Sequence, residues 1–251
     1  MSATIRAFLN IAALAAVIFV NYLANALPLN GRTTGELSAK YNVLITPAGY
    51  VFSIWGLIYL LLTIWVIIQV MPKNRNETVY RSIGLWFVLN CILNCTWIFV
   101  WHYELLGLSW IVMIGLLLSL IMIYTKIQNQ DNQSSFVRLP FSVYLGWISV
   151  ATIVNTAVVL KYGGWNGFGL SSVTWTVIML IVGTGLAIFF TIQNKDIIYP
   201  LVFVWAYIGI GVRHKGEIDV LTYTSFSLAI LLLIFIIWRA VTRKNGETAM
   251  K

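Results

Sequence analysis

Residues 86–101 read WFVLNCILNCTWIFVW. The stretch contains two asparagines, two cysteines and a threonine among apolar and aromatic residues, and it has no charged side chain. It approaches the roughly 20 residues that an α-helix needs to cross the hydrocarbon core of a bilayer. A helix on the surface of a soluble protein would carry charges on one face. The stretch therefore predicts a membrane helix whose polar groups face other helices.

The same composition extends over the whole chain. Of 251 residues, 60% are hydrophobic and 10% are charged, and the mean hydropathy is +0.87, whereas soluble domains carry about 25% charged residues. We therefore expect an all-α, polytopic helical membrane protein, and we exclude a water-soluble enzyme, a nucleic-acid binder and a disordered protein. Apolar runs between polar loops predict eight spans at 7–26, 48–71, 82–102, 106–126, 138–160, 172–192, 197–212 and 218–239.

The first span has two interpretations. Arg6, the apolar run 7–20 and Ala24-Asn25-Ala26 also fit a cleaved signal peptide. The run is long for a signal peptide, so we expect a retained helix.

The basic residues predict the orientation of the chain in a cell membrane. The sequence has 16 Lys and Arg against 8 Asp and Glu. With eight spans, 11 of the 16 basic residues fall on the side of the two termini and the other 5 on the opposite side. Because basic residues accumulate in cytoplasmic loops, we expect both termini in the cytoplasm. A basic tail at 241–251 would then lie against the anionic inner leaflet.

Aromatic and amide residues recur at helical spacing in three of the expected spans. Spacings of three and four residues place each set on one helix face. The sets are Phe52, Trp55 and Tyr59; Trp86, Asn90, Asn94, Trp97 and Trp101; and Tyr144, Trp147, Ala151 and Asn155. Four other tryptophans are expected at the membrane interfaces, where indoles gather: Trp65, Trp110, Trp165 and Trp238.

Two interpretations of these sets stay open from the residues alone. The rings and amides could pack helices together, with hydrogen bonds between neighbouring helices. Alternatively, they could line a site for a flat ligand, with indole rings as walls and amides as donors and acceptors. Ala151 would then leave a gap between the larger side chains.

The spans lack the groups that carry covalent or ion-coupled chemistry. No acidic residue, lysine or arginine falls near the middle of a span, which counts against a proton-coupled transporter. His102 and His214 lie at span ends, and Cys91 and Cys95 are expected to be inert thiols on another face of the third span. No nucleotide-binding or hydrolase motif is present in the sequence. We expect no catalytic residue, no metal site and no enzymatic activity.

Three motifs resemble the translocator protein family, also called tryptophan-rich sensory protein, TspO/MBR or peripheral benzodiazepine receptor. Residues 46–59, TPAGYVFSIWGLIY, are similar to the start of that family's second helix. Residues 93–97, LNCTW, are similar to its third helix, and residues 144–155, YLGWISVATIVN, to its fifth. The proline that the family has ahead of the tryptophan is replaced here by Ser53-Ile54.

The resemblance covers about residues 5–160. It implies a TspO-like five-helix bundle over residues 1–160, extended here by three helices at 161–240. It also implies that a flat hydrophobic ligand, such as protoporphyrin or haem, binds beneath the first extramembrane loop. By match to the motifs, the ligand would contact Trp55, Tyr59, Asn94, Trp97, Trp147, Ala151 and Asn155, and the helix-face sets add Phe52, Asn90 and Tyr144.

These observations favour a ligand-binding sensory or regulatory membrane protein. The alternative is a permease or transporter subunit for a small apolar or amphipathic molecule. Glycines at 183, 185, 209 and 211 would allow helices to pack closely and slide. An enzyme that modifies a porphyrin ranks last, because no acid–base group supports turnover. The expected partners are membrane lipid and the hydrophobic ligand, not nucleic acid, and a homodimer stays open.

Overall fold

The computed structural model describes residues 1–27, 29–74, 76–130 and 135–249, with the backbone alone at Ser135 and at 243–249. Within these residues all regular structure is helical. The α-helices are α1 (Ala3–Ala26), α2 (Thr34–Lys40), α3 (Ile54–Val70), α4 (Thr78–Ile83), α5 (Trp86–His102), α6 (Leu106–Gln128), α7 (Ser135–Tyr162), α8 (Ser172–Asn194), α9 (Tyr199–His214) and α10 (Asp219–Ala249). Short 3₁₀ turns are η1 (Leu29–Gly31), η2 (Gly49–Ser53) and η3 (Gly167–Gly169).

Six helical segments of the described chain are long and apolar enough to cross a membrane: α1, η2 with α3, α6, α7, α8 and α10. The predicted fold class, an all-α polytopic membrane protein, is confirmed. Two of the eight expected spans are shorter, since α5 has 17 residues and α9 has 16. The third expected span is also interrupted, because α4 ends at Gly84 with φ +58° and α5 begins two residues later.

The chain folds into two compact units. Unit 1 comprises Met1–Tyr41 and Phe52–Val159, and unit 2 comprises Asn42–Val51 and Leu160–Lys251. The segment Asn42–Val51 belongs to unit 2, although it lies in the chain between two parts of unit 1. Helix α10 runs on to Ala249 through the expected tail, whose basic side chains lie outside the described residues.

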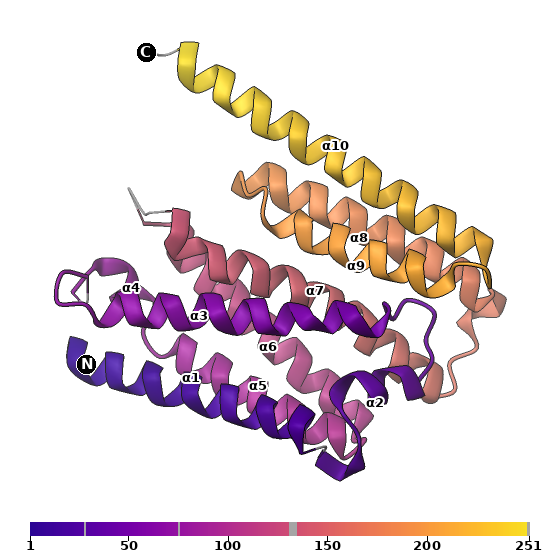
Figure 1. Cartoon of the computed structure of the whole chain (residues 1–251), viewed down its shortest axis with the longest axis horizontal. Helices are drawn as coiled ribbons and strands as arrows, with labels where there is room; N and C mark the ends of the chain where they lie inside the picture. Colours follow the sequence, from indigo (N-terminus) through magenta and orange to yellow (C-terminus); the bar gives the residue numbers. More distant parts are fainter. Residues whose placement is uncertain (28, 75, 131–134, 250–251) are drawn as a thin grey trace. The chain divides into compact units, whose positions relative to one another are not determined.

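Helix α5 lies at the centre of unit 1. Helices α1 and α6 pack on either side of its length, and α1 also packs on α3 (Figure 1). The Ser2 side chain caps α1 by accepting a hydrogen bond from the Ile5 N–H at 3.2 Å. Within the apolar run of α1, the Asn10 amide donates to Gln69 Oε1 of α3 at 2.9 Å. Such a bond between two buried amides joins helices where water is absent.

Trp65 forms a second aromatic centre of unit 1. Its ring lies 5.2 Å from Tyr80, 5.2 Å from Phe87 and 5.1 Å from Phe141, and the residue is 1% exposed. The expectation that Trp65 lies at the membrane interface is therefore wrong. Its position near the end of an apolar run suggested the interface, but α4 and the starts of α5 and α7 cover it. Trp110 and Trp238 are 36% and 55% exposed, as interfacial indoles would be.

Unit 2 packs α8, α9 and α10 against one another (Figure 1). Gly211 allows α9 to approach α10, since a Cβ atom there would meet the Phe226 ring at 2.9 Å. The Tyr207 hydroxyl donates to the Leu180 carbonyl at 2.7 Å and so joins α9 to α8. The Asp196 carboxylate accepts hydrogen bonds from the N–H groups of the next turn and starts α9.

Two tryptophans test this assignment of the core. Truncation of the buried ring in Trp65→Ala removes contacts with three rings, and we expect a loss of about 3–5 kcal/mol of unfolding free energy. The change Trp238→Ala removes a ring that is 55% exposed, and its effect should stay below about 1 kcal/mol. Thermal unfolding in detergent measures both. Equal losses would contradict the assignment.

Candidate functional site

A cluster of aromatic rings fills the interval between α3 and α7 in unit 1. The Trp55 ring stacks on Tyr59 at 5.4 Å and meets Tyr144 and Trp147 edge-on at 5.7 and 6.3 Å. Phe52 meets Trp147 edge-on at 5.7 Å. The rings of α3 and of η2 thus contact those of α7 directly. We call these five residues the ring cluster.

A chain of hydrogen bonds leads from α1 through α5 to this cluster. The Asn21 amide donates to Asn94 Oδ1 at 2.9 Å, and the Asn94 amide donates to the Tyr144 hydroxyl at 2.8 Å. The three residues are 7%, 1% and 2% exposed. Each of these groups would cost free energy if it were buried without a partner. These hydrogen bonds therefore hold Tyr144 against α5. The Tyr144 ring is also in contact with the Trp55 ring.

Four buried indole N–H groups of unit 1 find no acceptor among the described residues. They belong to Trp65, Trp97, Trp101 and Trp147, and of these Trp147 is part of the ring cluster. The Tyr59 hydroxyl is also buried, close to Asn94 and Tyr144 but outside hydrogen-bond geometry. An unmade hydrogen bond of a buried donor is costly. The Trp147 indole therefore leaves one donor unused within the ring cluster.

The structure brings six of the ten expected site residues together: Phe52, Trp55, Tyr59, Asn94, Tyr144 and Trp147. Trp97 lies one turn from Asn94 on α5 and stacks on Trp101 at 5.6 Å. Asn90 and Asn155 bond to α6 instead, with Asn90 donating to Ser119 Oγ at 2.8 Å and Asn155 lying 3.5 Å from Ser109 Oγ. Ala151 is partly exposed on α7.

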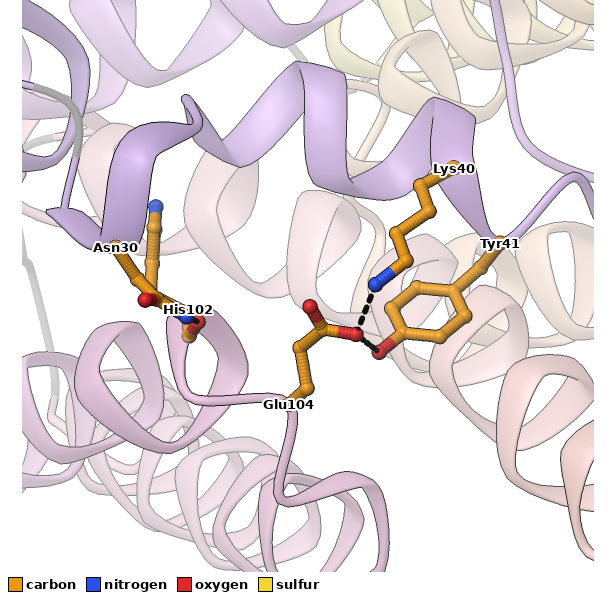
Figure 2. A network of polar contacts seen from close by, with 5 residues as sticks. All are labelled: Asn30, Lys40, Tyr41, His102 and Glu104. Atoms are coloured by element: carbon orange, nitrogen blue, oxygen red, sulfur yellow. Dashed lines mark hydrogen bonds and ion pairs between the residues drawn. The ribbon is translucent and has the colours of Figure 1, made fainter.

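The first loop is fastened to the end of α5 (Figure 2). Lys40 forms an ion pair with Glu104, and the Tyr41 hydroxyl donates to the same carboxylate at 2.7 Å. These hydrogen bonds hold the pKa of the Glu104 carboxyl below its usual value. Asn30 donates to the His102 carbonyl at 2.9 Å. The loop thereby places the Tyr41 ring 5.3 Å from Trp101, at the end of the Trp97–Trp101 stack.

The described residues contain no group of three or more His, Cys, Asp or Glu side chains that could hold a metal ion. Cys91 and Cys95 are free thiols. The Cys91 side chain is buried and that of Cys95 is partly exposed.

Asn21 is the site residue that the sequence analysis missed. It lies in the first apolar run, and Asn10 precedes it by 11 residues, which is close to three helical turns. Two amides at that spacing share one face of a membrane helix, and this was a usable signal for contacts with other helices. The motifs directed attention to the second, third and fifth spans instead.

A family model described as TSPO-like protein matches residues 7–238. The chain belongs to the TSPO-like family. The match runs beyond the region of about 5–160 in which the motifs lie, so α8, α9 and α10 are part of what this TSPO-like protein shares with the family. No curated protein and no solved structure matches the chain.

Asn94 is the central residue of the Asn21–Asn94–Tyr144 hydrogen bonds, so its substitution should lower the unfolding free energy. The variant Asn94→Leu leaves the Tyr144 hydroxyl without its donor and leaves the Asn21 amide with the Val17 carbonyl of its own helix as acceptor. We expect a loss of about 1–3 kcal/mol of unfolding free energy. Thr96→Val on the same helix serves as control, because the exposed Thr96 hydroxyl bonds only to the Ile92 carbonyl of its own helix. Thermal unfolding that shows the same loss for both variants would contradict the role of Asn94.

Proposed function

We propose that this TSPO-like membrane protein binds a flat hydrophobic small molecule, such as a tetrapyrrole, at the ring cluster of unit 1 for sensing or regulation. The observation that carries the proposal is the ring-filled interval between α3 and α7, joined to the Asn21–Asn94–Tyr144 chain. Flat aromatic walls favour a flat ligand through stacking. Amides held in fixed positions add a preferred orientation.

The rings already touch one another, so a ligand has to replace contacts between rings with contacts to itself. A stacked aromatic pair contributes about 0.5–1.5 kcal/mol beyond the area it buries. Because the stacking terms largely cancel, the gain on binding comes from the apolar surface of the ligand that leaves water and from a hydrogen bond with the Trp147 indole. We expect a dissociation constant on the order of micromolar, which corresponds to a binding free energy of about −8 kcal/mol.

No covalent step is part of the proposal. The contacts of the ring cluster come from aromatic rings and neutral amides, which offer stacking and hydrogen bonding and no general acid or base of suitable pKa. The ligand is accordingly proposed to leave unchanged, as in a sensor or a carrier.

A permease or transporter subunit is the second candidate function. Gly211 is the observation that bears on it, because a small residue there lets α9 and α10 pack closely at the Phe226 ring. Substrate-dependent flux into proteoliposomes distinguishes the two functions. A ligand that binds to the reconstituted protein and is not moved favours sensing.

Titration with protoporphyrin and with haem tests the binding site. Since the ring cluster contacts the macrocycle rather than the metal, the two ligands should bind with similar affinity. Trp147→Ala removes one wall and an unused donor, and we expect affinity to fall at least about tenfold, or ~1.4 kcal/mol. Tryptophan fluorescence quenching and the Soret band report binding.

Trp238→Ala is the matched control for this titration, because that indole is 55% exposed on α10 of unit 2. Its affinity should equal that of the wild type. Three results would contradict the proposal: no saturable binding to the wild type, equal affinity of wild type and Trp147→Ala, or a strong preference for haem. The last would indicate ligation of the iron, for which the Cys91 and Cys95 thiols are candidates.

The basic-residue count supports both termini in the cytoplasm. Single cysteines can be placed at the exposed residues Ala39, in the first loop, and Asn129, after α6, in a chain whose own cysteines are replaced by alanine. In intact cells an impermeant maleimide should label Ala39→Cys. It should label Asn129→Cys only after permeabilisation. The reverse pattern, or equal labelling, would refute this orientation.

A further inference from the structure

We propose that unit 2 positions the start of the ligand-binding helix by holding the segment Asn42–Val51, with Arg213 as the principal positioning residue. The segment belongs to unit 2 although it lies in the chain between α2 and α3, both of unit 1. Its last residue is joined directly to Phe52, the first residue of the ring cluster. The proposal rests on the proposed function only where it concerns ligand affinity.

The end of α9 holds the first half of the segment through its backbone. Arg213 donates to the carbonyls of Val43 and Thr46 at 3.1 and 2.8 Å, and to Asn42 Oδ1 at 2.7 Å. His214 Nε2 lies 2.7 Å from the Leu44 carbonyl, in hydrogen-bond contact. Residues 42–48 form no helix or strand, so their carbonyls need donors from elsewhere. Arg213 alone donates to two of these carbonyls, and its third hydrogen bond goes to the Asn42 side chain.

The acceptors of Arg213 are uncharged. A guanidinium head group usually faces a carboxylate in a protein interior, whereas this one faces two carbonyls and an amide oxygen. A shorter or uncharged side chain cannot reach three acceptors in this geometry. The arrangement therefore specifies the path of the segment rather than neutralising a charge.

The middle of α9 holds the second half of the segment. The Ala48 N–H donates to the Gly209 carbonyl at 3.1 Å, and Trp205 Nε1 donates to the Val51 carbonyl at 3.0 Å. Gly209 is required for this approach, because a Cβ atom there would lie 2.2 Å from a methyl carbon of Val51 and 3.2 Å from Pro47. Helix α9 is thus shaped to receive this one segment along two turns.

The segment leads without a break into the ring cluster. Val51 lies in η2, whose next residue, Phe52, meets the Trp147 ring, and Trp55 follows one turn later. Because η2 and α3 form one apolar run from Gly49 to Val70, a release of Val51 frees the first turn of that run. The rings at its start would then lose their fixed placement.

Hydrogen exchange of the full chain in nanodiscs, followed by mass spectrometry, tests the proposal. In Arg213→Gln we expect the amides of 42–51 to exchange at least about tenfold faster, and those of 52–59 several-fold faster, because local opening sets exchange rates. Helices α5 and α6 should be unchanged. Lys215→Gln, an exposed neighbour in the loop after α9, is the control and should match the wild type.

A second, milder variant keeps the test decisive if Arg213→Gln does not fold. Trp205→Phe keeps a ring on α9 and removes only the donor to the Val51 carbonyl, and it should show the same pattern with smaller changes. Faster exchange confined to 42–51, with 52–59 at the wild-type rate in both variants, would overturn the proposal. So would wild-type exchange throughout the segment.

Protoporphyrin affinity supplies the functional readout. Arg213→Gln should bind about tenfold more weakly than the wild type and Lys215→Gln, a factor that corresponds to ~1.4 kcal/mol. If the wild type binds no porphyrin, the proposed ligand is wrong and the exchange data still decide whether α9 positions the start of α3. If exchange changes as expected and affinity does not, the positioning role for the ligand site is refuted.

Discussion

The absence of water from the hydrocarbon core decides how unit 1 is built. A polar side chain on a membrane helix has to find its hydrogen bond within the protein or leave it unmade at a cost of free energy. Asn94 meets this requirement on both sides of its amide, since it accepts from Asn21 and donates to Tyr144. Three helices that are far apart in the chain are joined by two bonds.

The ring cluster depends on that junction. Tyr144 is held by Asn94, Trp55 packs against Tyr144, and the other rings pack against Trp55 and Trp147. The rings of α3 and α7 meet directly in this interface. It offers flat aromatic faces and, at Trp147, a buried indole donor without an acceptor among the described residues. The proposed binding function follows from this property.

Much of the fold could be predicted from the sequence. Apolar runs fix the helices because a membrane helix must satisfy its own backbone, and the spacing of three and four residues correctly joined Asn94 and Tyr144 to the tryptophans. Periodicity gives the face of a helix but not its neighbour, which is why Asn90 and Asn155 could not be seen to bond to α6. Trp65 was misplaced because its burial depends on α4, a six-residue helix without a clear pattern.

The assignment of the segment Asn42–Val51 to unit 2 could not be predicted from the sequence, for a similar reason. Its assignment to unit 2 depends on Arg213 and Gly209, which lie more than 150 residues further along the chain. Nothing in the local pattern of either stretch indicates the other. Contacts of that kind depend on the shape of α9 and on carbonyls that have no partner within a helix or strand of their own. Neither feature produces a periodic pattern in the sequence.

The indole N–H groups give the most direct test of ligand binding at the ring cluster. We would label the full chain with ¹⁵N-tryptophan, assign the indole resonances with Trp→Phe variants, and record spectra in micelles with and without protoporphyrin. The resonances of Trp55 and Trp147 should shift on binding, because both rings belong to the ring cluster, while those of Trp65 and Trp238, which lie outside the cluster, should stay in place. Unchanged Trp55 and Trp147 resonances at saturating porphyrin would contradict binding at the ring cluster.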